Sequence, residues 1–274
     1  MGTSRDVCTG GHAMRKLMAA ILSVALLAAA SGLAHGAAAG SAKGVKPDAS
    51  ADRAGTVQTL VVGSDVFIGD LVKTGPKGQV QILFADNTRL VVGPKSSLKI
   101  EDYLIRNDGS AGKLAVDMLG GAFRFSTGDA AKTRYKIDTP TGTIGVRGTQ
   151  FDVFVDPVTG ITWILHYRGI VTFCTTAGAC KELKDACTLG EITTDTKVLG
   201  DTAKITGEER RTLQSQFRYA MNQSPLLRDF WFQTAFDCLR KVPDVPPPEN
   251  HGFENGPTPP PPPTNEGRSL KRVP

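Results

Sequence analysis

The residues best suited to chemistry in this chain are its five cysteines and four histidines. Four of the cysteines fall in the C-terminal half, at Cys174, Cys180, Cys187 and Cys238. Thiolates bind zinc most often from Cys-x2-Cys pairs, and the sequence contains no such pair. The fifth, Cys8, lies in the N-terminal segment that we predict below to be removed as a signal peptide. An even number of remaining cysteines in an exported chain is typical of disulfide bonds. We therefore predict two disulfide bonds and no metal site.

The pairing that we favour is Cys174–Cys180 and Cys187–Cys238. The first bond would close a hairpin in which Gly178 makes the turn. The second would attach the C-terminal segment to the strands before it, and such a long loop contributes about 4 kcal/mol to stability in the chain-entropy account. The spacing leaves the other two pairings open.

The remaining residues give little indication of a catalytic site. His166 alternates with Trp163, Leu165 and Tyr167, so we expect it to face away from their core and to contact solvent. No motif supplies it with a nucleophile or a paired carboxylate. The sequence also has no Walker loop, no dinucleotide fingerprint and no His-Glu-x-x-His motif. We predict a protein that is not an enzyme and needs no cofactor.

Composition narrows the class of protein further. The 274 residues are 40% hydrophobic and 22% charged, which is typical of a globular chain. A formal net charge of +5 is mild, and the basic residues are not clustered as in nucleic-acid-binding proteins. Thirty glycines and only 7% aromatic residues favour many turns over long helices. We therefore expect no nucleic-acid partner.

The N-terminus has the organisation of a secretory signal peptide. Arg15 and Lys16 precede an apolar run from Leu17 to Ala30, and Ala34-His35-Gly36 has the small-x-small pattern of a cleavage site. The run is shorter than the roughly 20 residues that cross a bilayer as a helix. We predict a signal peptide over residues 1–36 and a periplasmic or secreted protein. An uncleaved membrane anchor is the alternative.

The central part of the chain predicts an all-β domain. Residues 37–55 are small and polar and predict a flexible leader. From residue 56 to residue 205, short apolar segments of period two are separated by turns such as Asp86-Asn87, Asn107-Asp108-Gly109 and Asp156 to Gly160. We expect a twisted sandwich or solenoid-like fold, without the exact internal repeats of a regular solenoid.

The pattern becomes helical near residue 206. Thr206 and Glu209 form a capping box, and we predict a short helical appendage over residues 206–241. Its second helix is expected to start at Ser224-Pro225, with Leu227, Phe230, Trp231, Thr234 and Cys238 on one stripe. Residues 242–274 contain most of the 17 prolines and predict a disordered tail or stiff spacer.

The segment from Val57 to about Phe173 resembles the FecR domain family. It contains a Gly-Asp step followed by Thr-Gly, and later a Thr-Pro followed by Val-Arg-Gly-Thr and an aromatic residue. The residues that carry the resemblance are Gly69, Asp70, Thr74, Gly75, Thr139, Pro140, Val146, Arg147, Gly148 and Thr149. The ordered set of motifs is specific, whereas any one of them alone is not.

This resemblance implies an extracytoplasmic all-β module. Founding members of the family belong to a sensor that passes a surface signal to a sigma factor, and they carry an anti-sigma segment and a membrane helix before the domain. Only 16 residues precede the apolar run here. We therefore expect a free-standing exported module, and a FecR-type transmembrane regulator only if the N-terminal segment is retained.

Arg147 is the candidate partner-binding residue, because it lies between glycines with no acid beside it in sequence. The competing interpretation, which we favour, is that its guanidinium ties together loop carbonyls or a distant carboxylate. The predicted function is non-catalytic binding of an envelope protein or a cell-surface polymer, in a sensing or scaffolding role. We expect an exposed sheet face or an edge strand to take part. A purely structural or polysaccharide-binding envelope component is the alternative.

Overall fold

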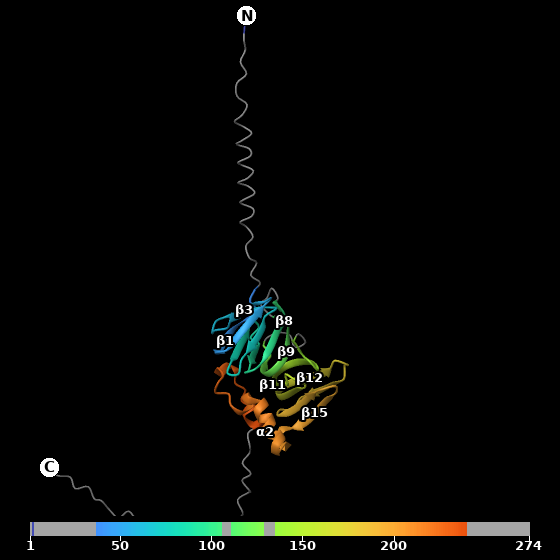
Figure 1. Cartoon of the computed structure of the whole chain (residues 1–274). Coiled ribbons are helices and arrows are strands. Elements are labelled where there is room, and N and C mark those ends of the chain that lie inside the picture. The colour runs from blue at the N-terminus through green and yellow to red at the C-terminus, as the bar shows by residue number, and fades with distance from the viewer. Residues whose placement is uncertain (1, 3–36, 106–110, 129–134, 240–274) are drawn as a thin grey trace, which may run out of the picture. The chain divides into compact units, whose positions relative to one another are not determined.

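The computed structural model describes residue 2 and residues 37–105, 111–128 and 135–239 (Figure 1). The predicted signal peptide, the turn at residues 107–109 and the proline-rich tail lie outside these residues. The residues described from 37 to 239 belong to one compact unit. No helix within the described ranges has the length and apolar character needed to span a membrane.

Strands are the main elements of the described chain. They are β1 Gly40–Lys46, β2 Ala49–Arg53, β3 Thr56–Thr59, β4 Asp65–Val66, β5 Leu71–Thr74, β6 Gln79–Phe84, β7 Arg89–Val92, β8 Ser97–Ile105, β9 Ala111–Ser126, β10 Tyr135–Thr139, β11 Gly142–Val155, β12 Thr162–Thr175, β13 Cys180–Leu183, β14 Thr188–Ile192 and β15 Thr196–Asp201. The helical elements follow as η1 Thr202–Lys204, α2 Gly207–Gln216, α3 Arg218–Met221, η2 Arg228–Phe230 and α4 Ala235–Cys238. The all-β core with a short helical appendage is thus confirmed.

The strands form one connected sheet that folds back on itself. Its main path runs β15-β14-β12-β11-β10-β9-β7-β6-β1-β4, while a branch joins β9 through β8 and β5 to the β2–β3 hairpin. Only the β9–β10 pair is parallel among the pairings described. Strand β9 serves both parts of the sheet, because its first half pairs with β8 and β10 and its second half pairs with β7 and β11.

The change of partner along β9 takes place at Gly120-Gly121. Gly121 has a positive φ of 104°, and a Cβ atom there would lie 2.6 Å from the Cα of Ser96. Only glycine allows this backbone conformation and this close approach without strain. The body that results encloses a core of Val, Ile, Leu and Phe side chains contributed by strands from β1 to β14.

The leader predicted for residues 37–55 is wrong, since these residues form β1 and β2. Ala42 and Ala49 are buried in the core, and β1 lies between β4 and β6. The small side chains are needed for close packing, because a Cβ atom on Gly40 would lie 2.6 Å from the Leu83 carbonyl oxygen. A composition typical of a loose segment therefore belongs here to a tightly packed strand.

Strand β12 is buried on both faces. Ile164, Val171 and Phe173 belong to the core of the β body, whereas Leu165 and Tyr167 pack against the C-terminal segment. The predicted alternation is present, but the face expected to contact solvent is covered. That face carries Ile164 and His166 and is buried on the side of the β body, whereas the C-terminal segment covers the opposite face, with Leu165 and Tyr167. Figure 1 shows this orange C-terminal segment beneath the sheet.

The first predicted helix is present as α2, while the second is not a continuous helix. Thr206 precedes α2 as its N-cap, but its hydroxyl makes no capping hydrogen bond. Between Ser224 and Cys238 only the short η2 and α4 form. Glutamine side chains outside the predicted helix accept from backbone N–H groups there. Gln81 Oε1 accepts from Leu227 N at 2.7 Å, and Gln223 Oε1 accepts from Phe232 N at 2.8 Å. These tertiary bonds replace helical ones.

Candidate ligand-binding pocket

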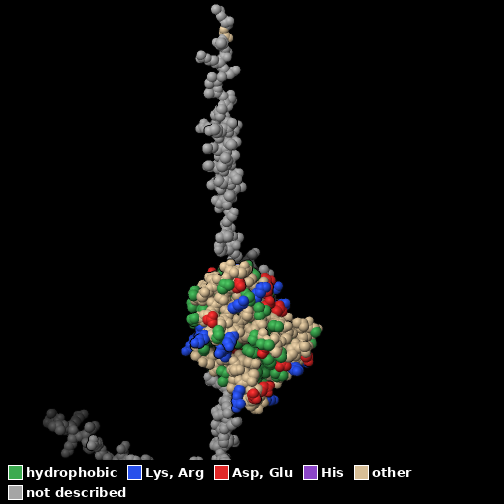
Figure 2. All heavy atoms as spheres, in the orientation of Figure 1, with side chains coloured by type: hydrophobic (Ala, Val, Ile, Leu, Met, Phe, Trp, Pro, Cys, Tyr) green, Lys and Arg blue, Asp and Glu red, His purple; other side chains and the backbone are tan. Residues whose placement is uncertain are grey.

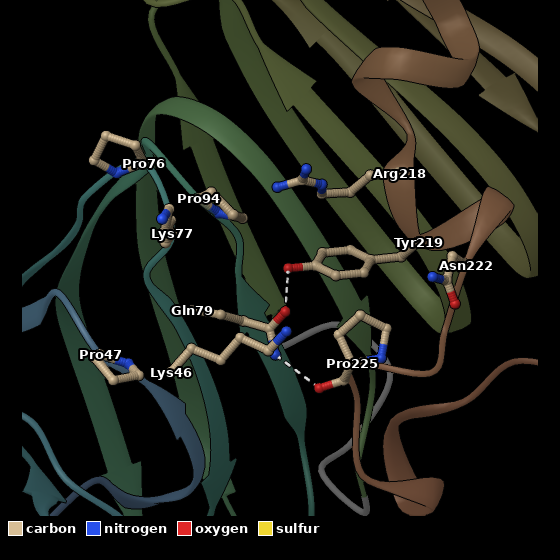
Figure 3. Close-up of a pocket in the computed structure, with 10 residues that line it drawn as sticks. All are labelled: Lys46, Pro47, Pro76, Lys77, Gln79, Pro94, Arg218, Tyr219, Asn222 and Pro225. Carbon is tan, nitrogen blue, oxygen red and sulfur yellow. Dashed lines mark hydrogen bonds between the residues drawn. The ribbon is translucent and has the colours of Figure 1, made fainter.

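A pocket of about 650 Å³ lies where the β body meets the C-terminal segment (Figure 3). Its wall combines residues from the N-terminal strands with residues from α3 and the turn after it. The lining residues are Lys46, Pro47, Pro76, Lys77, Gln79, Pro94, Arg218, Tyr219, Asn222 and Pro225. The volume falls within the roughly 300–1,000 Å³ of small-ligand sites in proteins.

Two turns of the β body form one wall of the pocket. The turn after β1 carries Lys46 and Pro47, and the turn after β5 carries Pro76 and Lys77. The turns are joined by a hydrogen bond from Gly75 N to the Asp48 carbonyl at 2.8 Å. A Cβ atom on Gly78 would lie 2.1 Å from that same carbonyl oxygen, so a side chain is excluded there.

The turn between β7 and β8 also belongs to this wall, and Thr74 holds it in place. Its hydroxyl donates to the Gly93 carbonyl at 2.5 Å and accepts from Ser96 N at 3.0 Å. These bonds hold the connection between β7 and β8, which places Pro94 at the pocket. The Thr74-Gly75 step of the sequence motif therefore positions pocket walls without lining the pocket itself.

The opposite wall comes from the C-terminal segment and is attached through Gln79. The buried Gln79 side chain accepts a hydrogen bond from the Tyr219 hydroxyl at 2.9 Å and donates one to the Pro225 carbonyl at 3.2 Å (Figure 3). Burial raises the pKa of Tyr219 well above its usual value, so the phenol is neutral and donates this bond. One carboxamide thereby ties both walls together.

The charged groups of the lining are all cationic. Lys46, Lys77 and Arg218 are exposed, and none of them has an ion-pair partner among the residues that the structure describes. Figure 2 shows Lys and Arg side chains gathered where the N-terminal strands meet the C-terminal segment. Asp48 neighbours the pocket in sequence, but its carboxylate lies against Gly75. The lining therefore favours an anionic ligand.

A buried ionic cluster beneath the pocket holds the C-terminal segment on the β body. Arg124 of β9 forms a two-point ion pair with Asp152 of β11, at 2.7 Å and 2.9 Å. Its Nη1 donates to Gln223 Oε1, and the guanidinium lies 4.4 Å from the ring centre of Phe232. The hydroxyl of Tyr167 donates to Asp152 at 2.7 Å. The cluster thus joins three strands to the segment that carries half of the pocket.

The Gly69-Asp70 step of the motif stabilises a turn of the β body. Asp70 is fully buried and accepts hydrogen bonds from Phe67 N at 2.9 Å and from the Arg53 Nε at 2.6 Å. Gly69 has a positive φ of 86°. These residues fix the turn that leads into β5, and they lie outside the pocket lining.

The later part of the motif shapes the β10–β11 hairpin and a bulge in β11. The Thr139 hydroxyl donates to the Gly142 carbonyl at 3.0 Å across the turn that contains Pro140. Val146 and Thr149 are buried, and Gly148 takes a positive φ of 63° where the register with β12 shifts. A Cβ atom on Gly169 would lie 2.2 Å from the Gly148 carbonyl oxygen, so two backbones cross closely here.

Arg147 lies apart from the main pocket. Its side chain is exposed and lines a small hollow with Tyr135, Thr172 and Glu182. Hydrogen bonds with Lys184 and Thr172 lower the pKa of Glu182, and the charge of Arg147 lowers it further. No hydrogen bond from Arg147 to a loop carbonyl occurs within the described part of the chain. Its role in partner binding stays a prediction.

The placement of His166 corrects the sequence expectation. The imidazole is fully buried rather than solvated, and its Nδ1 lies 2.8 Å from the Asp185 carbonyl oxygen. The Nε2 atom has no hydrogen-bond partner among the described residues. The loop between β13 and β14 covers this face of β12, which is why alternation alone gave the wrong environment.

Both cysteine pairs are bonded as favoured from the sequence. Cys174–Cys180 closes the β12–β13 hairpin, and Cys187–Cys238 joins the start of β14 to α4. The second bond lies in the apolar cluster beneath the C-terminal segment. No group of His, Cys, Asp and Glu side chains suited to a metal occurs in the described ranges.

Three carboxylates form a separate cluster on neighbouring strands: Glu101 on β8, Asp117 on β9 and Asp138 on β10. Asp117 pairs in register with Lys99 on one side and Asp138 on the other. Burial, together with a hydrogen bond and the negative charge from Glu101, raises the pKa of Asp117 to about 6. Lys99 and Lys136 form ion pairs with Glu101 and Asp138. Glu101 and Asp138 thus each have an ion-pair partner, whereas no ion pair of Asp117 occurs among the described residues.

This cluster predicts a specific pH dependence of stability. The folded-state pKa of Asp117, about 6, exceeds the ordinary value of 3.8, so folding favours its protonated form. The stabilisation is complete below about pH 4 and is lost as the pH rises through 6. We expect Asp117→Asn to gain stability relative to the wild type between pH 4 and pH 7, measured by urea unfolding. A difference that does not change with pH would contradict the assignment.

The main pocket is absent from the sequence expectations, and no sequence signal pointed to it. Gln79 and Pro225, which meet in its wall, are separated by 146 positions. Each cation occurs singly, at a strand end, in a turn or in a short helix, without a recognisable motif. Among the motif residues, only Thr74 and Gly75 contribute to the pocket, and they do so indirectly, through hydrogen bonds that hold the turns of its wall.

Comparison with known proteins supports the resemblance inferred from the motifs. Residues 70–169 match the family described as FecR protein. Three chains of solved structures also match. Two of them are crystal structures of a putative anti-sigma factor from Parabacteroides distasonis, with 12% and 14% identity and TM-scores of 0.40. They cover 53% of this chain, which spans 63% and 64% of theirs.

A search of curated proteins found no match. The family match covers the Thr-Gly, Thr-Pro and Val-Arg-Gly-Thr motifs in their expected order. Residues 70–169 are thus similar to the FecR protein family, as the motifs predicted.

Proposed function

We propose that this protein is a non-catalytic binding module of the bacterial envelope, exported to the periplasm or beyond, with a sensing or scaffolding role. The observation that carries the proposal is the cationic pocket between the β body and the C-terminal segment. Its walls are fixed by Gln79 and by the buried Arg124–Asp152 pair, so the pocket is formed before any ligand binds. A preformed site loses little conformational entropy on binding.

Two observations support an extracytoplasmic location. The two disulfide bonds are compatible with an oxidising compartment, where such bonds persist. The FecR domain is compatible with the same location. The predicted signal peptide at residues 1–36 supplies the route of export.

The pocket is a better candidate than an edge strand for partner recognition. Strand β3 pairs only with β2 among the described strands, and Val57 on it is exposed, as are Val61 and Val62 in the following loop. This edge offers backbone groups and apolar surface, but no charge that would select a partner. The pocket instead combines a concave shape with three cations, which gives selectivity as well as contact area.

Crosslinking in intact cells tests the proposal. A crosslinker that does not enter the cytoplasm should give one discrete adduct of the wild-type protein. The variant Lys46→Ser/Lys77→Ser/Arg218→Ser should lose most of that adduct while keeping its melting temperature. The matched variant Arg168→Ser/Lys181→Ser/Lys184→Ser removes three exposed cations that do not line the pocket, and it should keep the adduct. An equal loss in both variants, or no adduct of the wild type, would overturn the proposal.

A further inference from the structure

The three cations of the pocket are supplied by separate parts of the chain. Lys46 ends β1, Lys77 lies in the β5–β6 turn, and Arg218 begins α3. In Figure 3 the three side chains surround the pocket opening from different sides. A single small anion such as phosphate would occupy only a fraction of about 650 Å³. The spacing therefore suits a ligand that carries several negative charges along its length.

The pocket has no aromatic surface on which nucleic-acid bases could stack. Tyr219 is its single aromatic residue, and the ring is buried with its hydroxyl bonded to Gln79. The Arg124 guanidinium lies 5.6 Å from the centre of that ring. Proteins that bind single-stranded nucleic acid use exposed aromatic rings for this purpose. The site therefore does not suit a polynucleotide.

The backbone around the pocket does not suit an extended peptide either. Pro47, Pro76, Pro94 and Pro225 contribute four of the ten lining residues, and proline has no backbone N–H to donate. Recognition of a peptide strand depends on a series of such donors along an open edge. The proline rings instead present rigid apolar CH surfaces, and the polar groups free to bind are side chains.

From this combination, and resting on the function proposed above, we propose that the pocket binds an anionic glycan. The apolar faces of the sugar rings would lie against the proline rings. The carboxylate or sulfate groups would lie near Lys46, Lys77 and Arg218, as charge-assisted partners. Asn222 lines the pocket beside Pro225, and its Oδ1 accepts from Ser224 N at 2.9 Å. Its side-chain NH2 group would donate hydrogen bonds to sugar hydroxyls.

Binding of defined oligosaccharides to the purified mature chain tests this proposal. The probes are a hexasaccharide of uronic acid, its uncharged methyl ester, a sulfated hexasaccharide of the heparin type and a hexaglutamate peptide. Calorimetry should detect binding of at least one charged hexasaccharide and at least tenfold weaker binding of the methyl ester. The variant Lys46→Ser/Lys77→Ser/Arg218→Ser should bind about 100-fold more weakly, if each charge-assisted contact contributes about 1 kcal/mol.

The control and the possible outcomes separate this proposal from the preceding one. The variant Arg168→Ser/Lys181→Ser/Lys184→Ser has the same net charge as the pocket variant and should bind like the wild type. Uronate binding without sulfate binding, or the reverse, identifies the source of the negative charge. Tighter binding of hexaglutamate than of either glycan, or no glycan binding, overturns the glycan proposal. If the crosslinked adduct still depends on the pocket, the proposed function survives that failure.

Discussion

Replacing Asp152 by alanine is expected to lower the free energy of unfolding by about 3–5 kcal/mol. The substitution leaves the Arg124 guanidinium, which is 1% exposed, without its anionic partner in the interior. Burial alone would lower the pKa of Arg124, but Asp152 and Tyr167 together more than offset that effect and raise it. Without Asp152 the charge remains buried and unpaired. Urea unfolding followed by circular dichroism measures the loss.

A double variant separates the cost of an unpaired charge from the contribution of the pair. Arg124→Met/Asp152→Leu removes both charges and keeps apolar volume, so it should recover most of the lost stability. It should nevertheless loosen the C-terminal segment, because the contact between Arg124 and Gln223 is lost. A loss below about 1 kcal/mol for Asp152→Ala would show that the cluster is solvated and does not anchor the segment.

Removing the Cys187–Cys238 bond is expected to have the second large effect. The bond spans 51 positions, whereas Cys174–Cys180 spans 6. In the chain-entropy account, Cys187→Ala/Cys238→Ala lowers the free energy of unfolding by about 4 kcal/mol and Cys174→Ala/Cys180→Ala by about 2 kcal/mol. Guanidinium unfolding of both variants under non-reducing conditions measures the difference.

The two disulfide variants should also differ in where they become accessible to protease. Loss of Cys187–Cys238 frees α4, which lies in the apolar cluster with Leu213 and Phe217 of the C-terminal segment. Cleavage should therefore begin in that segment. The hairpin variant should keep the segment protected. Equal stability losses, or first cleavage in the β body in both variants, would contradict the anchoring role given to the longer bond.

The β architecture could be predicted from local patterns because those patterns act locally. Asn87 takes a positive φ of 64° in the predicted β6–β7 turn. Asp156 Oδ1 accepts from Val158 N and Thr159 N at 2.8 Å in the turn predicted before β12. The Cys174–Cys180 bond was favoured by the same reasoning, since these two cysteines flank a glycine turn. Each of these features depends on a few neighbouring residues.

The errors arose where distant segments decide the local structure. Small residues in β1 were mistaken for a leader because their close neighbour, Leu83, is far along the chain. In the predicted second helix, the backbone N–H of Leu227 donates instead to the side chain of Gln81, 146 positions away. His166 was expected at the surface because nothing local indicated the covering loop. Packing over such distances overrides propensity and periodicity.

The candidate pocket was unpredictable for the same physical reason. Its walls meet only when residues about 140 positions apart become hydrogen-bonded, as Gln79 and Tyr219 are. The Gly69-Asp70 and Thr74-Gly75 motifs specify the turns beside the pocket, so they indicated the family and fold. They carried no information about the cations, which come from residues outside any motif.

The most direct test of this account is photo-crosslinking from the pocket in living cells. A photoreactive amino acid would replace Asn222 in the pocket lining in one strain and Val158, which is 91% exposed and distant in sequence from every lining residue, in another. The account predicts a discrete envelope adduct from position 222 and none from position 158. Adducts of equal yield from both positions, or from position 158 alone, would contradict recognition through this pocket.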